Sequence, residues 1–299
     1  MKEIKFTTNY ELALSFADKS FKTKYEERVG NNPGYTQVVN GELKHLAVCP
    51  RCNNPVAILG IYKKIDVAPH ARHAKGIDIP HVAKYNEYKY LNCPYHKRKA
   101  DYIKEYVPET EQPERRKLYK LAKEHFDKAI YLLQKETGIY INLTMAEALA
   151  ENYVRTRAYN YIDATIYNIP WYLIYSYSGF PLYHMNIRKN TLLYKRLVKI
   201  GLNLKDSKIE NYVYVENREG YLLTATNYRY AVDNNDNINE WLDFSIIRPD
   251  DTVTDTLLYI PVERFSIKVD SYYFGNLIQY KDWSPRQNLL QIAGKYMHP

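Results

Sequence analysis

Short apolar runs bounded by turn residues predict strands in the N-terminal part of the chain. Residues 35–39 and 43–48 are two such runs, and the dipeptide Asn40-Gly41 between them favours a two-residue hairpin turn. Residues 55–62 form a further β-leaning run. Residues 8–16 differ, because a capping box precedes their apolar positions and predicts a short amphipathic helix.

Helical spacing of apolar residues dominates the middle of the chain. Apolar residues recur every three or four positions over residues 113–138, a segment that opens with proline and closes with glycine. A second helix is predicted from a capping box at Thr144 to about residue 159, and a third over residues 192–200. The aromatic segment around Trp171 is predicted to form the core of this helical region.

The pattern changes again after about residue 206. Short β-leaning runs are separated there by turn residues, and the polar run 233–239 is predicted to be one of these turns. The predicted strands cover residues 212–216, 221–226, 241–247, 256–262 and 265–269.

Basic charge is concentrated in one window of the sequence. The formal net charge of the chain is +8. Residues 44–99 contain eleven Lys or Arg and three acidic residues, so their excess of eight equals that of the whole chain. This window therefore favours an anionic partner. Tyrosine is also frequent, with 32 copies against 8 Phe, which fits both an A- and T-rich coding sequence and rings that stack on nucleobases.

The three cysteines stand in two matched short motifs. Cys49-Pro50-Arg51-Cys52 and Cys93-Pro94-Tyr95-His96 both place two residues between potential metal ligands. Zinc prefers thiolate and imidazole ligands, and a two-residue spacer lets one tight turn present both. We therefore predict a structural zinc ion bound by Cys49, Cys52, Cys93 and His96, with His73 as the alternative fourth ligand.

The segment between the two motifs resembles two kinds of zinc module. We call the tight turn of each cysteine motif a knuckle, the first at residues 49–52 and the second at residues 93–96. The first knuckle is expected at the tip of a hairpin, which is similar to a zinc ribbon. Residues 49–99 as a whole resemble zinc-stapled HNH-type endonucleases. In that family an acidic residue stands directly beside the catalytic histidine, whereas Asp66 and His70 are separated by three residues. The resemblance implies His70 or His73 as general base, Asp66 as ligand of a second divalent metal, and Asn86 as the residue that orients the loop.

Basic and aromatic residues interleave around the second motif. Such a surface can contact phosphates through its cations and stack bases on its rings, so we predict nucleic-acid binding here. A solvated basic face on a purely structural zinc module is the competing interpretation, and a non-catalytic adaptor that binds another protein is a third. The candidate nucleic-acid-binding residues are Lys84, Tyr85, Tyr88, Lys89, Tyr90, Lys97, Arg98 and Lys99.

Cysteine usage and apolar windows also bear on the compartment. Three cysteines, all used by the proposed zinc site, argue against a disulfide framework and favour a reducing cytoplasm. The first 24 residues are interrupted by charges and do not resemble a signal peptide, and residues 164–183 are too broken by proline and polar residues to span a membrane. No membrane partner is expected. Basic, tyrosine-rich chains of this kind are associated with phages and mobile elements.

Together these patterns predict a multidomain α+β protein. We expect a zinc-ribbon-like β domain over residues 1–105, a helical region over residues 106–205 and a β-rich region over residues 206–299.

Overall fold

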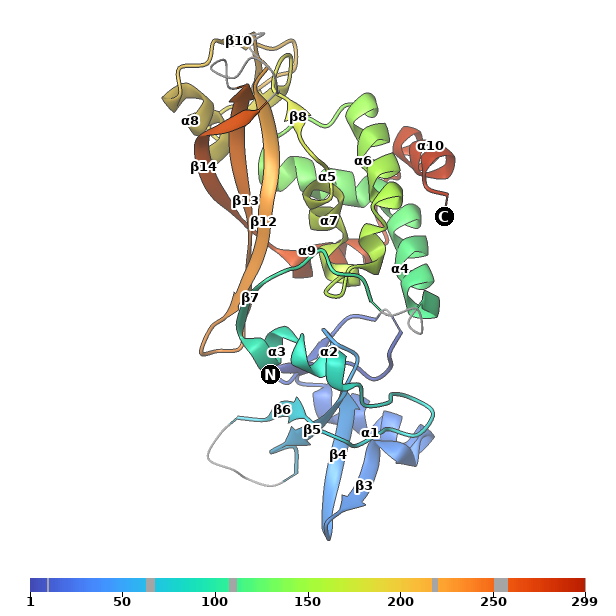
Figure 1. Ribbon diagram of the computed structural model, residues 1–299. Helices are drawn as coiled ribbons and strands as arrows, with labels where there is room; N and C mark the ends of the chain where they lie inside the picture. The colour runs from blue at the N-terminus through green and yellow to red at the C-terminus, as the bar shows by residue number, and fades with distance from the viewer. Residues whose placement is uncertain (10, 63–67, 108–111, 217–219, 250–257, 299) are drawn as a thin grey trace. The chain divides into compact units, whose positions relative to one another are not determined.

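The computed structural model mixes helices with antiparallel sheets, which confirms the α+β class (Figure 1). The chain divides into two compact units. Unit 1 consists of residues 1–100 and 231–238, and unit 2 of residues 101–230 and 239–299. The structure describes all residues except 10, 63–67, 108–111, 217–219, 250–257 and 299.

A four-stranded antiparallel sheet forms the centre of unit 1. Its strands follow one another in the order β3 (Thr36–Val39), β4 (Glu42–Val48), β5 (Pro55–Leu59) and β6 (His70–His73). The predicted hairpin is confirmed: Asn40 and Gly41 have φ angles of 51° and 79°, as the tight turns of two-residue hairpins require. The first cysteine motif follows β4 directly and therefore lies in the loop between β4 and β5.

A helix and a small strand pair complete the core of unit 1. Tyr25 of the helix and Leu46 of β4 are both fully buried, and the Tyr25 hydroxyl donates a hydrogen bond of 2.9 Å to the carbonyl oxygen of Tyr35. Burial of such large side chains is the main stabilising contribution in a unit of this size. The elements are β1 (Glu3–Ile4), β2 (Leu14–Ser15), α1 (Phe21–Asn31) and the 3-10 turn η1 (Pro33–Tyr35).

The helix predicted over residues 8–16 is wrong. The Glu11 carboxylate accepts hydrogen bonds of 2.6 Å from the backbone N–H groups of Phe6 and Thr7, so it closes a turn instead of capping a helix. Leu14 then pairs with Ile4 in an antiparallel strand pair. The period of two in the apolar positions 12, 14 and 16 suits a strand better than a helix.

Two short helices connect the sheet of unit 1 to β7 (Lys99–Asp101). They are α2 (Glu87–Leu91) and α3 (Pro94–Lys97), which carries the second cysteine motif. The side chain of Asn86 caps α2 by accepting a hydrogen bond of 2.9 Å from the backbone N–H of Lys89.

The helices of unit 2 surround the aromatic segment that the sequence identifies as core. Trp171 is fully buried, and every residue of its helix α7 is buried as well. The helix predicted over residues 113–138 is interrupted at His125 and becomes two helices, while those predicted over residues 144–159 and 192–200 are confirmed as α6 and α8. The helices are α4 (Gln112–Glu124), α5 (Phe126–Thr137), α6 (Leu143–Arg155), α7 (Ile169–Tyr175), α8 (Leu192–Lys199), α9 (Ser271–Gln279) and α10 (Gln287–Tyr296), with 3-10 turns η3 (Ala158–Asn160) and η4 (Ile166–Asn168).

Two sheets accompany these helices. The larger has the order β14-β13-β12-β7, with β8 paired to β12, and the smaller has the order β10-β11-β9. The two strands predicted over residues 256–262 and 265–269 form a single strand in the described part, and α9 and α10 were not predicted. The strands are β8 (Phe180–Pro181), β9 (Asn186–Arg188), β10 (Leu204–Asp206), β11 (Tyr212–Val215), β12 (Leu222–Val232), β13 (Ile238–Pro249) and β14 (Tyr259–Val269).

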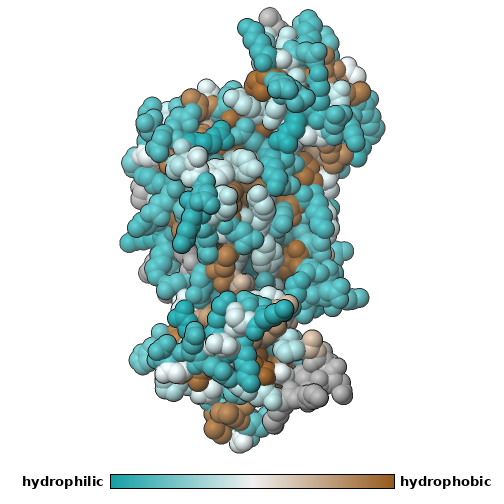
Figure 2. All heavy atoms as spheres, turned by 180° about the vertical axis from the view of Figure 1, so that it is seen from behind, coloured by the Kyte–Doolittle hydropathy of each residue, from teal (hydrophilic) through white to brown (hydrophobic). Residues whose placement is uncertain are grey.

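Most of the face drawn in Figure 2 is hydrophilic, with scattered apolar patches. In unit 1 the opposed residues Val38 and Leu43, near the tip of hairpin β3–β4, are 71% and 60% exposed. Among the described residues, none of the helices has both the length and the apolar character that a membrane crossing requires.

Candidate metal centre

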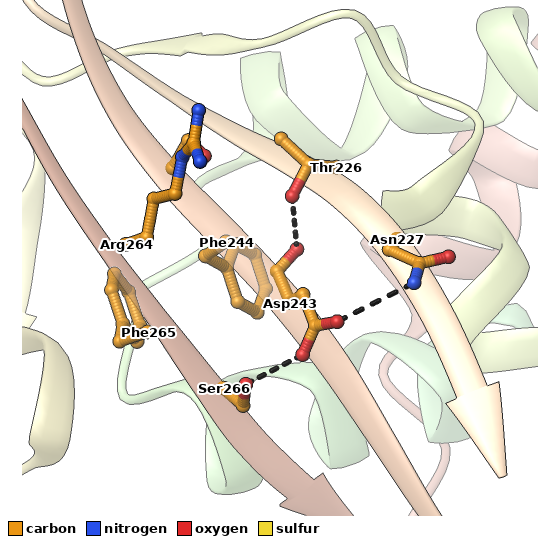
Figure 3. A pocket seen from close by; sticks show the side chains of 8 residues that line it. Thr226, Asn227, Asp243, Phe244, Arg264, Phe265 and Ser266 are labelled. Atoms are coloured by element: carbon orange, nitrogen blue, oxygen red, sulfur yellow. Dashed lines mark hydrogen bonds between the residues drawn. The ribbon is translucent and has the colours of Figure 1, made fainter. Parts of the chain in front are cut away.

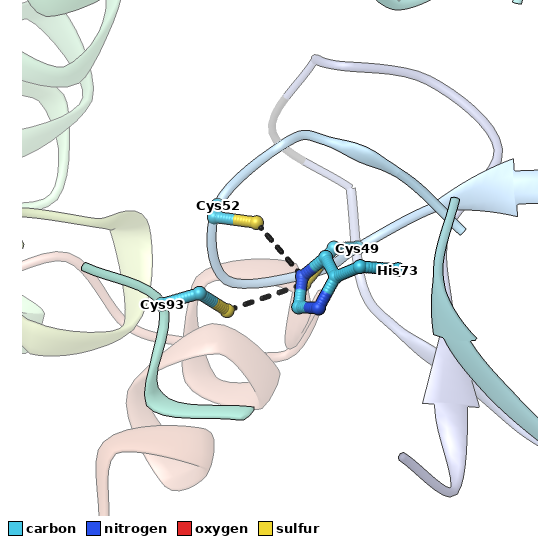
Figure 4. A group of neighbouring side chains, drawn as sticks. All are labelled: Cys49, Cys52, His73 and Cys93. Atoms are coloured by element: carbon cyan, nitrogen blue, oxygen red, sulfur yellow. Dashed lines mark hydrogen bonds between the residues drawn. The ribbon is translucent and has the colours of Figure 1, made fainter. Parts of the chain in front are cut away.

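Four side chains with metal-binding atoms come together in unit 1. The sulfur atoms of Cys49, Cys52 and Cys93 and a ring nitrogen of His73 all lie within 4.8 Å of one another (Figure 4). The sequence predicts the three cysteines as ligands, and His73 is its alternative fourth ligand. No other group of this kind is found among the residues that the structure describes.

The first knuckle is a tight turn that begins where β4 ends. The backbone N–H of Cys49 donates a hydrogen bond of 2.8 Å to the carbonyl oxygen of Asn54, and the carbonyl oxygen of Cys49 accepts one of 3.1 Å from Asn53. Asn53 has a φ angle of 61°, a left-handed conformation that asparagine tolerates better than most residues. This turn brings Cys52 back beside Cys49.

His73 reaches the knuckle through strand pairing. It is the last residue of β6 and lies opposite Val56, the second residue of β5. The end of β6 is thus beside the start of β5, immediately after the knuckle. The Nε2 atom of His73 lies 3.2 Å from the sulfur of Cys52.

Cys93 comes from a third segment of the chain. It is the residue before helix α3, and its carbonyl oxygen accepts hydrogen bonds of 2.9 Å from the backbone N–H groups of His96 and Lys97. Its sulfur lies 3.8 Å from that of Cys49. Both cysteines are buried, so this half of the centre is closed to solvent.

His96, the fourth ligand that the sequence favours, is not among the four clustered side chains. Its ring packs against Tyr90, with 4.1 Å between ring centroids, and the Tyr90 ring in turn contacts His73 at 5.1 Å. The structure therefore places the alternative ligand, His73, with the cysteines. The physical reason is that motif spacing reflects only the local turn at Cys93, whereas the pairing of β5 with β6 brings a distant histidine to the same place.

The separations fit a tetrahedral ion of the size of Zn²⁺. With Zn–S bonds of about 2.3 Å and Zn–N bonds of about 2.0 Å, tetrahedral geometry places two sulfurs roughly 3.8 Å apart and a sulfur and a nitrogen roughly 3.5 Å apart. The corresponding distances here are 3.8 Å between Cys49 and Cys93 and 3.2 Å between Cys52 and His73. The cluster can therefore hold a metal ion with little movement of the backbone. Three thiolates and one imidazole are a donor set typical of structural zinc.

The charges of the four groups depend strongly on one another. Burial and the hydrogen bonds to Cys49 raise the pKa of the Cys52 and Cys93 thiols. Burial also opposes ionisation of Cys49, but hydrogen bonds from the other two thiols and the charge of His73 lower its pKa well below the usual range. For His73, burial would lower the pKa, yet the Cys49 thiolate raises it to about 10. The site thus stabilises a thiolate beside a cation, the arrangement that a bound metal ion would replace.

Asn54 supports the centre, although it was not among the residues predicted from the sequence. Its side-chain N–H group donates a hydrogen bond of 3.4 Å to the sulfur of Cys52, and its side-chain oxygen accepts one of 2.6 Å from the backbone N–H of Asn86. Asn54 is only 1% exposed. It therefore links the first knuckle to the start of α2. The signal in the sequence is its position two residues after a ligand, in a turn where buried amides commonly bond to thiolates.

The residues implied by the nuclease resemblance do not gather at one place. Asp66 lies outside the described residues. The ring of His70 donates a hydrogen bond of 3.0 Å to the carbonyl oxygen of Ala68, while His73 lies at the opposite end of β6 among the cysteines. Asn86 caps α2. His73 as a metal ligand would not be available as a general base.

The candidate nucleic-acid-binding residues divide into two groups. Several are engaged within unit 1: Arg98 donates hydrogen bonds to Asp236 and to the carbonyl oxygen of Asp233, at 3.0 and 2.6 Å. Tyr85 donates to Glu87, and Tyr90 packs on the two histidines. Lys89 is partly buried. The side chains of Lys84, Tyr88, Lys97 and Lys99 are exposed, and the Lys97 Nζ atom donates a hydrogen bond of 2.8 Å to the side-chain oxygen of Asn92.

Unit 2 contains a pocket of about 420 Å³ on the face of strands β12, β13 and β14 (Figure 3). Asp243 lies at its centre and accepts hydrogen bonds from Asn227, Arg229 and Ser266. Its charge is thus already compensated by neighbouring side chains.

Comparison of the chain with known protein families, with curated proteins and with solved structures yields no match.

Proposed function

We propose that unit 1 is a zinc-stabilised module that binds nucleic acid. The observation that carries this proposal is the position of exposed lysines beside the second knuckle. Lys97 and Lys99 follow Cys93 by four and six residues, and Lys84 precedes α2. The backbone N–H of Lys97 donates a hydrogen bond of 2.9 Å to the carbonyl oxygen of Cys93.

Zinc would act here as a structural crosslink. The four ligands come from three segments that are distant in sequence, namely the β4–β5 loop, the end of β6 and the start of α3. Binding of one ion joins these segments and contributes its binding free energy to folding. All four coordination positions would be filled by protein, which is typical of structural and not of catalytic zinc. The use of three reduced cysteines fits a cytoplasmic location.

The charge of this region supports an anionic partner. Residues 44–99 carry an excess of eight basic residues, and Arg98 is engaged by the tip of the β12–β13 hairpin. Lys84, Lys97 and Lys99 are exposed and can contact phosphates, a contact that requires flexible cations and no particular sequence. Tyr88 is 39% exposed on α2 and offers a ring in the same basic segment of the sequence. Tyr90 would instead act by packing against the two histidines.

A mobility-shift titration at several salt concentrations tests this proposal. Wild-type protein and the triple variant Lys84→Ala, Lys97→Ala, Lys99→Ala are titrated with a duplex DNA of arbitrary sequence. Each phosphate contact contributes about 0.9 to the slope of log affinity against log salt. The variant is expected to bind more weakly and to lower this slope by about 2 to 3.

The matched control removes three lysines from another part of the same unit. Lys19, Lys22 and Lys24 lie at or near the start of α1, and their replacement by alanine changes the net charge by the same amount. Equal losses in the two triple variants would show an effect of net charge alone and would contradict the proposed surface. Absence of binding by the wild-type protein at low salt would contradict nucleic-acid binding altogether.

A further inference from the structure

The small sheet of unit 2 has two very different faces. On strands β9 and β11, Ile187, Val213 and Val215 form its inner face and are between 0% and 4% exposed. Side chains alternate between the faces of a strand, so the residues next to these three point the other way.

Aromatic and basic residues occupy the outer face. Tyr212 of β11 lies opposite Arg188 of β9, and Tyr214 lies between Asn186 of β9 and Lys205 of β10. Directly opposed residues of antiparallel strands share a face and lie side by side. Both tyrosines are partly exposed and Lys205 is exposed.

Further rings extend this surface. His184 stacks on Tyr214 with ring planes 1° apart and centroids 5.6 Å apart, and Tyr140 contacts the Tyr212 ring edge-on at 5.9 Å. The guanidinium carbon of Arg188 lies 6.0 Å from the Tyr212 ring centroid. Tyr140, His184, Arg188, Tyr212 and Tyr214 are together called the tyrosine face.

The chain around the tyrosine face is basic. Residues 186–208 contain seven Lys or Arg and one acidic residue. Nearby carboxylates compensate part of this charge, because Lys189 pairs with Asp206, Lys205 with Glu216, and both Arg196 and Lys199 with Glu263. The balance is still positive, and the side chains of Lys195 and Lys208 are exposed.

We propose that the tyrosine face binds single-stranded nucleic acid by stacking bases on Tyr212 and Tyr214. The two residues are about 6.8 Å apart along the strand, so their rings can engage neighbouring bases of an extended strand. Stacking of this kind needs unpaired bases, which a duplex does not present, and the positive surroundings attract the phosphates. The inference rests on the proposed function in that it assigns the same class of ligand, at a second surface.

The test is the fluorescence anisotropy of labelled oligothymidylate and oligouridylate with the full chain. The double variant Tyr212→Ala, Tyr214→Ala is expected to lose affinity about 5-fold or more for each ring, thus about 25-fold or more in total. The variant Tyr212→Phe, Tyr214→Phe keeps both rings and should bind like the wild type. The salt dependence should be similar in all three proteins, because stacking releases few counterions.

Controls separate a local effect from a loss of fold. Tyr280→Ala removes a tyrosine that is 56% exposed and belongs to no strand of this sheet, and it should leave the affinity unchanged. Crosslinking of wild-type protein to an iodouridine-containing oligonucleotide should attach the label to the peptide that contains Tyr212 and Tyr214. This result does not depend on any variant folding.

The proposal is overturned if a folded double alanine variant binds as tightly as the wild type, or if the crosslink maps to other residues. It is also overturned if the wild type binds no single strand, in which case the duplex titration still decides the role of unit 1. Loss of single-strand affinity in the triple lysine variant alone would assign this binding to unit 1 and not to the tyrosine face.

Discussion

Replacement of His73 by alanine removes the only nitrogen donor of the metal centre and so tests the ligand set directly. Binding of zinc at a structural four-ligand site is worth about 10–16 kcal/mol, so one ligand contributes on the order of 3 kcal/mol. Loss of His73 is therefore expected to weaken zinc binding about 100-fold. The other three ligands remain in place, because the turn at Cys49 and the start of α3 are fixed by their own backbone hydrogen bonds.

His96→Ala is the matched control for this change. His96 is exposed, lies three residues after Cys93 and contacts Tyr90 with its ring. Its removal deletes an imidazole of the same size but no member of the cluster. Zinc affinity should change less than about 3-fold, since only packing around the centre is altered.

Competition with a coloured zinc chelator measures both affinities, and thermal unfolding with and without the chelator shows the linked stability. Zinc at 100 times its dissociation constant stabilises the folded state by about 2.7 kcal/mol, a contribution that His73→Ala should nearly abolish. The opposite result, in which His96→Ala loses zinc while His73→Ala retains it, would refute the assignment of His73.

The same ligand set implies a pH dependence for the wild type. Burial raises the pKa of the Cys52 and Cys93 thiols, and both must release their protons before they bind a metal ion. Zinc affinity should therefore fall as the pH is lowered, by about tenfold per pH unit for each proton released. Chelator competition between pH 6 and 8 would show this slope, and a flat profile would contradict coordination by these thiols.

Two further substitutions test supporting contacts. Asn54→Ala removes the amide that donates a hydrogen bond to the sulfur of Cys52. It should weaken zinc binding by about 10-fold to 100-fold in the same competition assay. An unaltered zinc affinity would contradict a supporting role for Asn54. Glu240→Ala removes a buried carboxylate that accepts hydrogen bonds of 2.6 and 2.7 Å from the Tyr102 and Tyr228 hydroxyls. It should lower the free energy of unfolding in urea by about 2–5 kcal/mol, and Glu240→Gln, which keeps an acceptor oxygen, should lower it clearly less.

Local signals in the sequence predicted local structure well. Asn40-Gly41 specifies its hairpin through two positive φ angles, and the spacing within each cysteine motif reflects a single tight turn. Helix α6 was predicted from a capping signal near its start, and α8 from the glycine that follows its end. In α6, however, the capping residue is Asn142 and not Thr144, because the side-chain oxygen of Asn142 accepts a hydrogen bond of 2.9 Å from the backbone N–H of Met145.

These local signals do not predict which residues pair when they are far apart in the sequence. The choice between His73 and His96 depends on the pairing of β6 with β5, and neither spacing nor composition encodes that pairing. Asn54 is recognisable as part of a turn, but its bond to Asn86 joins residues 32 positions apart. The break at His125 and the helices α9 and α10 likewise depend on packing within unit 2, which short periodic patterns do not reveal.

The tip of the β12–β13 hairpin, residues 231–238, is the last part of unit 1 to be synthesised. Arg98 bonds to Asp236, which is 138 residues later in the chain, so a ribosome adding about 5–20 residues per second makes this partner roughly 7 to 28 s after Arg98. All four residues of the metal centre precede position 94 and are therefore translated well before the tip. A nascent unit 1 that binds a metal ion at this site would thus be crosslinked while it still lacks its last eight residues, and the ion would protect it during that interval.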